Sequence, residues 1–480
     1  MPALFNHNLP LDVIEGVAWG QEWQAGYDKH PPLSAWAMES FRLLFARADL
    51  GQYFLSQLFV AVTLVSVWRL ARDILAPRQA LLATLSLVGV YFCNFTTPEF
   101  NANVCLMPLW ALAALFFWRA ARTDETRYWA LAGVASGLGM LAKYAMVFLL
   151  IPIAIAFLVI PQFRHALKRR GPYIALGLFA TVIVLHLVWA YRHDLTTVQY
   201  AMTRARVDGG SAFDHIWFPS RFVLGLMVSG LAAIGLLACA GLSIGRRPCN
   251  NSEDRAARLY LLFVLVGPIA LLVLTSLVTG WRLRTMWGTT LLLFAPAAAL
   301  AFFQLRNTPR TRTVFRLVWA LFFLAPVVSY GLVSGTSPYI TGKAKRVHFP
   351  GRELARVVEA RWNERYTQPF EIVIGPTWEA GCVSNYSQAR PRVVLEGRLD
   401  RSPWVSEDAI RESGAAIIYP RGQRDRYVRP WSGHLDTTQT ITLPALFHEV
   451  TPDYEYEIAF VAPHWSRNAP RPVARPIICD

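Results

Sequence analysis

Long apolar blocks separated by short loops fill the chain up to residue 336 and then stop. A helix needs about 20 apolar residues to cross a bilayer. Only 16% of the residues are charged, whereas a soluble protein carries about 25%. The pattern predicts a mostly α-helical, polytopic transmembrane bundle of about 10 spans. The expected spans are 51–75, 78–97, 101–121, 127–143, 144–162, 172–191, 218–244, 257–279, 285–304 and 313–336.

Arginines in alternate loops predict the orientation of these spans. Five successive alternate loops are arginine-rich, at residues 69–78, 119–127, 164–170, 246–258 and 306–316. By the positive-inside rule these loops are cytoplasmic. The external side then holds the loop 11–50, the loop 192–217 and everything after about residue 337. Within the first loop, residues 32–46 predict an amphipathic helix lying in the membrane interface.

The tail 337–480 has the composition of a soluble α/β domain. Strands are expected in the segments FEIVIG, PRVVLEG, GAAIIYP, TQTITLPALF and YEYEIAFVAP, with a helix in SPWVSEDAIRES. The alternation of strand and helix is typical of a small α/β domain. The segment GPTWEAG is neither a dinucleotide fingerprint nor a P-loop. We therefore expect two domains, a transmembrane module 1–336 and an external domain 337–480.

The net charge of +15 does not indicate a nucleic-acid partner. Most of the basic excess lies before residue 337, where loop charge sets membrane orientation. No basic run is interleaved with aromatic residues, as single-strand binders require. The six cysteines form no CxxC pair, so the sequence contains no recognisable metal site.

A few charged residues on the external side are not explained by orientation. Asp12 and Glu15 are three residues apart, on one face if the segment is helical; the alternative is favourable charge at a helix N-terminus. Lys29 and His30 precede a double proline, which holds the preceding backbone extended; a snorkelling lysine is the alternative.

Three further cations, Lys143, Arg282 and Arg284, also break the positive-inside trend. A guanidinium suits phosphate through its planar donor fork, although lipid headgroups offer the same phosphate. Asn101 either binds sugar hydroxyls or caps the next helix. Glu99 is a second acid or a metal ligand, but the sequence offers no ligand set for a metal.

These segments resemble the GT-C superfamily of membrane glycosyltransferases, specifically family 39 and its bacterial relatives. That group includes protein O-mannosyltransferases, lipid A aminoarabinose transferases and lipopolysaccharide galacturonosyltransferases. The first-loop motif corresponds to Glu15, Tyr27, Lys29-His30 and Pro31-Pro32-Leu33. Further similarity lies in EFNANVCLMPLWALAALFFWRA, YWALAGVASGLGMLAKYA and SLVTGWRLRTMWG, so that it runs from about residue 11 to 300.

The resemblance implies an enzyme of the bacterial inner membrane with a periplasmic C-terminal domain. It would move a sugar from a polyprenyl phosphate to a glycolipid or other envelope acceptor. A carboxylate, Glu15 or Asp12, would act as the base. Cations would neutralise the departing lipid phosphate. The expected substrate-binding residues are Tyr27, Lys29, His30, Lys143, Arg282, Arg284 and Asn101, with no assigned metal, although the chemistry would allow a divalent ion.

Two departures from the family pattern matter. Members usually carry a membrane helix before the acidic loop, so such a helix is expected to be missing ahead of Asp12. Their adjacent acid pair is altered here, because Ile14 precedes Glu15. Which acid is the base stays open.

Three other functions remain: protein O-glycosylation, transport or flipping of a lipid-linked sugar, and a non-catalytic assembly role. Transporters place charge near the bilayer midplane, whereas the unexplained charges here gather at external membrane ends. The sequence therefore favours glycosyl transfer at the surface.

Overall fold

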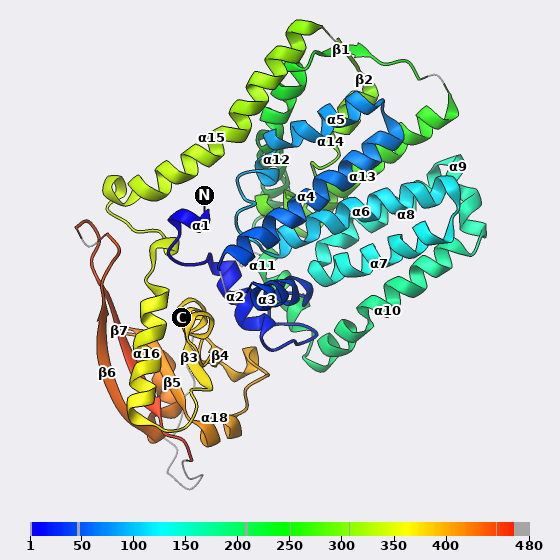
Figure 1. Cartoon of the computed structure of the whole chain (residues 1–480). Coiled ribbons are helices and arrows are strands. Elements are labelled where there is room, and N and C mark those ends of the chain that lie inside the picture. The colour runs from blue at the N-terminus through cyan, green and yellow to red at the C-terminus, as the bar shows by residue number, and fades with distance from the viewer. Residues whose placement is uncertain are drawn as a thin grey trace. The chain divides into compact units, whose positions relative to one another are not determined.

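The computed structural model describes residues 2–45, 49–206, 210–249, 251–306, 308–447 and 449–464. It divides into two compact units (Figure 1). The helical unit comprises Ala25–Ser34 and Gly51–Ser329, and the mixed unit comprises Met1–Gln24, Ala35–Leu50 and Tyr330–Asp480. The mixed unit thus contains the predicted tail together with part of the first loop. The division into 1–336 and 337–480 stays a prediction.

Long helices make up most of the helical unit. Six helices are long and apolar enough to cross a membrane, or seven if the pair bent by 95° at residue 160 is one span. The long helices are α4 Asp49–Ile74, α6 Ala102–Thr123, α10 Gly171–Arg192, α12 Asp214–Cys239, α13 Ser252–Thr279 and α15 Pro309–Thr341. The shorter ones are α5 Pro77–Leu85, α7 Thr126–Ala142, α8 Val147–Val159, α9 Pro161–Arg164, α11 Thr196–Ala205 and α14 Ala295–Phe302. The chain is therefore a helical membrane bundle.

The predicted count of ten spans is not settled by these helices. The expected span 78–97 is broken into α5 and two 3-10 helices, Ser86–Gly89 and Tyr91–Cys93. The helix α14 covers only eight residues of the expected span 285–304. A short hairpin of β1 Leu242–Arg246 and β2 Phe303–Leu305, which the sequence did not predict, joins the ends of α12 and α14.

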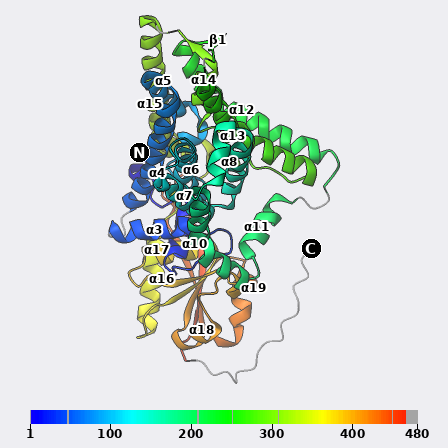
Figure 2. The same cartoon turned by 90° about the vertical axis from the view of Figure 1, so that its right-hand side faces the viewer.

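Glycines set how closely the helices of this unit approach. The helix α7 lies between α6 and α10 (Figures 1 and 2). A Cβ at Gly133 would lie 2.3 Å from the carbonyl oxygen of Ala175, and one at Gly137 would lie 2.7 Å from Val182. Small residues at membrane helix interfaces allow this close contact.

The mixed unit is built on a five-stranded sheet of order β4-β3-β5-β7-β6. The strands β4, β3 and β5 are parallel, and β7 and β6 join them as antiparallel neighbours. The elements are β3 Ile372–Gly375, β4 Arg392–Leu395, β5 Ala415–Pro420, β6 Leu435–Leu443, β7 Tyr454–Val461, α16 Gly351–Arg365, α17 Thr377–Tyr386, α18 Glu407–Ser413 and α19 Arg424–Val428. The five predicted strands and the predicted helix are confirmed, and the tail is an α/β domain.

The N-terminal segment and the first loop add three helices to the mixed unit, α1 Pro2–Phe5, α2 Leu11–Gly20 and most of α3 Leu33–Leu44. The helix expected at 32–46 is confirmed as α3; its placement in the membrane interface stays a prediction. The helix α2 packs against α17. This contact places the two candidate acids in the same unit as the tail.

Candidate active site

The two candidate acids lie on α2 but differ in burial. Glu15 is 7% exposed, whereas Asp12 is exposed and lies in the first turn of the helix. An acid in a first turn favours the helix dipole, so the position of Asp12 has a structural explanation. Burial of a carboxylate costs free energy. Glu15 lies beyond the first turn of α2, so the helix dipole does not account for its position.

Ile14 faces the tail. Its side chain is fully buried, and its Cγ2 would lie 2.6 Å from a Cβ placed at Gly381 on α17. A carboxylate at position 14 would therefore be packed against a helix. The apolar residue at this position suits its surroundings.

Residues 27–30 form a tight turn in the helical unit. The amide of Tyr27 donates to the carbonyl of His30 at 3.1 Å, and the Tyr27 ring is fully buried. The double proline follows, and α3 begins at Leu33. The ring of His30 makes an edge contact with Tyr200 on α11, with centroids 6.0 Å apart. The turn is therefore anchored at Tyr27 and holds His30 against α11.

Three cations surround His30. Burial, together with the charges of Lys143, Lys29 and Arg204, lowers the pKa of His30 to about 3. The imidazole is therefore neutral at physiological pH. The positive charge around His30 comes from Lys143, Lys29 and Arg204, and His30 itself contributes a neutral ring.

Arg282 and Arg284 extend the same group. The amide of Arg282 donates to the carbonyl of Ala205 at the end of α11, at 2.8 Å. Burial and the charges of Arg204 and Arg282 lower the pKa of Arg284. Because Arg204 acts on both His30 and Arg284, the residues Lys29, His30, Lys143, Arg204, Arg282 and Arg284 form one basic cluster.

The basic cluster contains an unsatisfied donor. Within the described residues, the buried Nε of Arg284 has no hydrogen-bond acceptor. A buried donor without a partner costs about 1–3 kcal/mol. An anion placed there would satisfy it and offset the mutual repulsion of the cations.

Lys143 and Asn101 have local partners. The Nζ of Lys143 donates to Oδ1 of Asn103 at 2.5 Å. The side chain of Asn101 caps α6 by accepting from the amides of Asn103 and Val104. The capping interpretation of Asn101 accounts for its side-chain oxygen. No group of three potential metal ligands occurs within the ranges that the structure describes.

Sequence reasoning missed Tyr200 and Arg204. Both lie on the short helix α11 within the external loop 192–217. Arg204 breaks the positive-inside trend in the same way as Arg282, so the same signal would have found it. Tyr200 carries no such signal in the sequence.

The structure brings Lys29, His30, Lys143, Arg282 and Arg284 together in the helical unit. Tyr27 belongs to the same turn, and Asn101 neighbours the Lys143 partner. Asp12 and Glu15 lie in the mixed unit. The basic cluster and the two acids thus belong to different compact units.

Comparison with known proteins gives matches in both sequence and fold. Residues 29–189 match the family described as dolichyl-phosphate-mannose-protein mannosyltransferase. A lipid A galacturonosyltransferase of Rhizobium johnstonii is 26% identical over 191 residues, which is 40% of each chain. The chain thus spans well under half the length of this curated relative.

The fold is similar to that of ArnT from Cupriavidus metallidurans. Its structure bound to undecaprenyl phosphate has a TM-score of 0.62 at 13% identity, covering 95% of this chain and 94% of that one. The apo structure of the same protein gives 0.57 with the same coverage. At this identity the likeness concerns the fold. The chain therefore has a multi-pass helical membrane fold similar to that of ArnT, and its residues 29–189 are similar to a family of membrane glycosyltransferases.

Proposed function

We propose that the protein transfers a sugar from a polyprenyl-phosphate donor to a glycolipid acceptor on the periplasmic face of the bacterial inner membrane. The observation that carries this proposal is the basic cluster, with its unsatisfied Arg284 donor. Cations from four separate segments act on His30 and Arg284 there: Lys29, Lys143, Arg204 and Arg282. A phosphate ester is the ligand that this chemistry fits.

The reaction needs a leaving group, a base and an acceptor. As the glycosidic bond breaks, negative charge builds on the lipid phosphate, and fixed cations lower the free energy of that transition state. Glu15 takes the proton of the acceptor hydroxyl as C1 gains oxocarbenium character. Its burial favours it over the exposed Asp12.

The identities of donor and acceptor come from the relatives. One relative is named for lipid A and galacturonic acid, and the structural neighbour was solved with undecaprenyl phosphate. We therefore assign lipid A or another lipopolysaccharide glycolipid as the acceptor class. The matching family is described as a protein mannosyltransferase. A protein is therefore the second candidate for the acceptor.

A transfer assay with the purified protein in nanodiscs tests the proposal. Undecaprenyl-phosphate-linked galacturonic acid would be supplied with lipid A or with a serine-containing peptide, and the products read by mass spectrometry. We expect a glycosylated lipid A. Glycosylated peptide alone would move the function to protein O-glycosylation. Absence of transfer to either acceptor would overturn the enzyme assignment.

Arg284→Gln is the matched variant for the basic cluster. It should lower kcat and raise the donor KM, because the lost interaction strengthens as charge develops on the phosphate. Arg164→Gln, on a predicted cytoplasmic loop, is the control and should change neither constant more than about twofold.

A further inference from the structure

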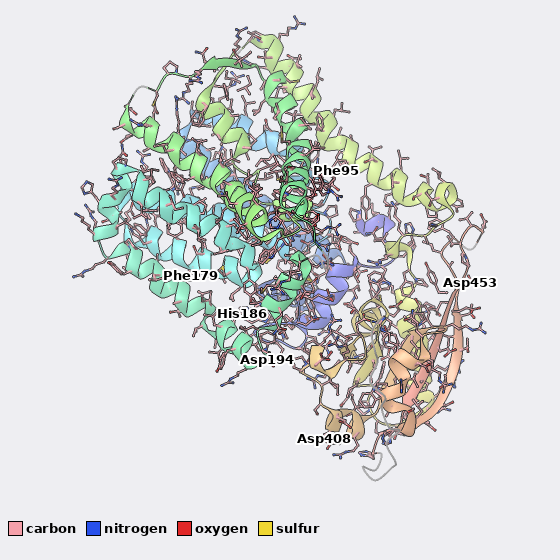
Figure 3. The ribbon with its side chains drawn as sticks, turned by 180° about the vertical axis from the view of Figure 1, so that it is seen from behind. Phe95, Phe179, His186, Asp194, Asp408 and Asp453 are labelled. Atoms are coloured by element: carbon pink, nitrogen blue, oxygen red, sulfur yellow. The ribbon has the colours of Figure 1, made fainter. Side chains whose placement is uncertain are left out.

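A chain of hydrogen bonds runs through the helical unit beside the basic cluster. Its central residue is His186 on α10, which is 3% exposed and lies near the end of that helix, as Figure 3 shows. His186 Nδ1 is 2.7 Å from the carbonyl oxygen of Ala25. Its Nε2 is 2.6 Å from the hydroxyl of Tyr144, which is 2.6 Å from the hydroxyl of Thr197.

The direction of these hydrogen bonds can be assigned. A carbonyl oxygen only accepts, so Nδ1 of His186 carries the proton and donates to Ala25. In the neutral ring, Nε2 then accepts from Tyr144, and the Tyr144 oxygen accepts from Thr197. Every polar atom in this chain has a defined role. Such a fully satisfied buried network holds its members in one arrangement.

Three residues that take part in this network lie on segments that carry part of the basic cluster. Ala25 begins the loop that leads to Lys29 and His30. Tyr144 directly follows Lys143. Thr197 lies on α11, the helix that carries Arg204. One imidazole therefore links three segments that are far apart in the sequence.

Packing around His186 holds the first of these segments close to α10. A Cβ at Gly26 would lie 2.3 Å from the ring of Trp189, so only glycine allows the loop to come this near. Trp189 stacks on His193 with centroids 4.2 Å apart. The loop backbone therefore lies directly on the helix surface, next to its hydrogen bond with His186.

We propose that His186, acting through Tyr144, is a positioning residue that sets the spacing of the phosphate-binding cations. This inference rests on the proposed function, because it assumes that the basic cluster binds the donor phosphate. Preorganised cations bind a phosphate without first being brought together against their own repulsion. Loss of the network would let the three segments separate, and the donor would have to reassemble them.

Tyr144→Phe is the decisive variant. It removes one oxygen atom and breaks the hydrogen bonds to both His186 and Thr197, while the ring keeps its packing. Binding would be measured with undecaprenyl phosphate as the probe, by tryptophan fluorescence of the protein in nanodiscs. The donor KM and kcat would be measured in the transfer assay. Tyr191→Phe, on the same helix as His186 and 82% exposed, is the matched control.

We expect Tyr144→Phe to weaken undecaprenyl phosphate binding by about tenfold and to raise the donor KM similarly. Tyr191→Phe should stay within twofold of the wild type. A general loss of folding would instead reduce the active fraction, lowering kcat with KM and Kd unchanged. That pattern, or binding by Tyr144→Phe within twofold of the wild type, would overturn the positioning role.

His186→Gln provides a rescue test, because its amide oxygen can still accept from Tyr144. It should bind undecaprenyl phosphate more tightly than His186→Leu does; equal binding by the two would contradict the network. The proposed function fails separately. If the wild type itself does not bind undecaprenyl phosphate, the donor assignment is wrong and the positioning role falls with it.

Discussion

At the scale of single residues, Glu15 is the strongest candidate for the base. It is buried on α2, whereas Asp12 is exposed. Glu15→Gln removes the proton acceptor while keeping the side-chain volume, so we expect transfer to fall by about 100-fold or more. Asp12→Asn should cost less. Steady-state transfer assays on both variants, at matched expression, would check this; the reverse order would assign the base to Asp12.

His30 offers a prediction about pH. Its pKa is lowered from its ordinary value to about 3 by burial and by the charges of Lys143, Lys29 and Arg204. The free enzyme therefore holds His30 neutral throughout pH 5–8. The pH dependence of kcat/KM reports ionisations of the free enzyme. His30→Gln should therefore leave the shape of the kcat/KM profile unchanged between pH 5 and 8. Loss of an inflection near pH 6.5 would show that His30 titrates normally.

The site residues differed in how well the sequence could predict them. Lys143, Arg282 and Arg284 were found because charge on the external side breaks a general rule of membrane topology. Tyr200 and His186 gave no such signal, since a lone aromatic or histidine in an apolar stretch fits ordinary packing. Their roles depend on contacts between segments far apart in the sequence.

At the scale of elements, local pattern predicted most strands but not every helix. The strands β3 and β5 are short apolar runs bounded by turn residues, which is a strong local signal. The helix α17 contains Gly381 and has little amphipathic pattern, because it is buried on several sides. The breaks in the expected span 78–97 fall within the apolar stretch SLVGVYFC, so hydropathy could not predict them.

The contact of α2 with α17 gives a prediction about packing. Gly381 leaves no room for a side chain, because its Cβ would lie 2.6 Å from Ile14. Gly381→Ala should destabilise the mixed unit by about 1–3 kcal/mol through overpacking. Thermal unfolding would report this as a lower Tm. In a double-mutant cycle, Gly381→Ala should cost less stability in an Ile14→Ala background than in the wild type, and equal costs in the two backgrounds would contradict the contact.

At the scale of the whole molecule, the tail and most of the first loop belong to one compact unit. Two ion pairs, one buried and one exposed, connect them across more than 300 residues of sequence. Glu39 on α3 is 1% exposed and pairs with Arg390 after α17, and Asp49 pairs with Arg352 on α16. Since α2 carries Glu15 and packs against α17, we expect the tail to hold the proposed base in place.

Arg390 tests this support. Its guanidinium binds both oxygens of Glu39, at 2.9 and 2.5 Å, and its carbonyl accepts from the side chain of Gln21 just beyond α2. Arg42 also pairs with Glu39 at 3.0 Å. Arg390→Ala therefore leaves a buried carboxylate with one cation instead of two. We expect a loss of about 2–3 kcal/mol, less than the ~3–5 kcal/mol typical of a buried pair broken outright.

The control for Arg390 is Arg421→Ala, which breaks an exposed pair with Glu455 in the same unit. Exposed pairs contribute about 0–1 kcal/mol, so this variant should keep the wild-type Tm and activity. Arg390→Ala should instead lower the Tm by several degrees. Because the Glu39 pair no longer fixes the Arg390 backbone carbonyl that binds Gln21 beside α2, it should also reduce kcat without weakening undecaprenyl phosphate binding. We expect kcat and lipid binding to respond differently because the basic cluster lies in the other compact unit. Equal behaviour of the two variants would show that the tail does not support α2, and weaker lipid binding in Arg390→Ala would show that the two units do not act separately on base and phosphate.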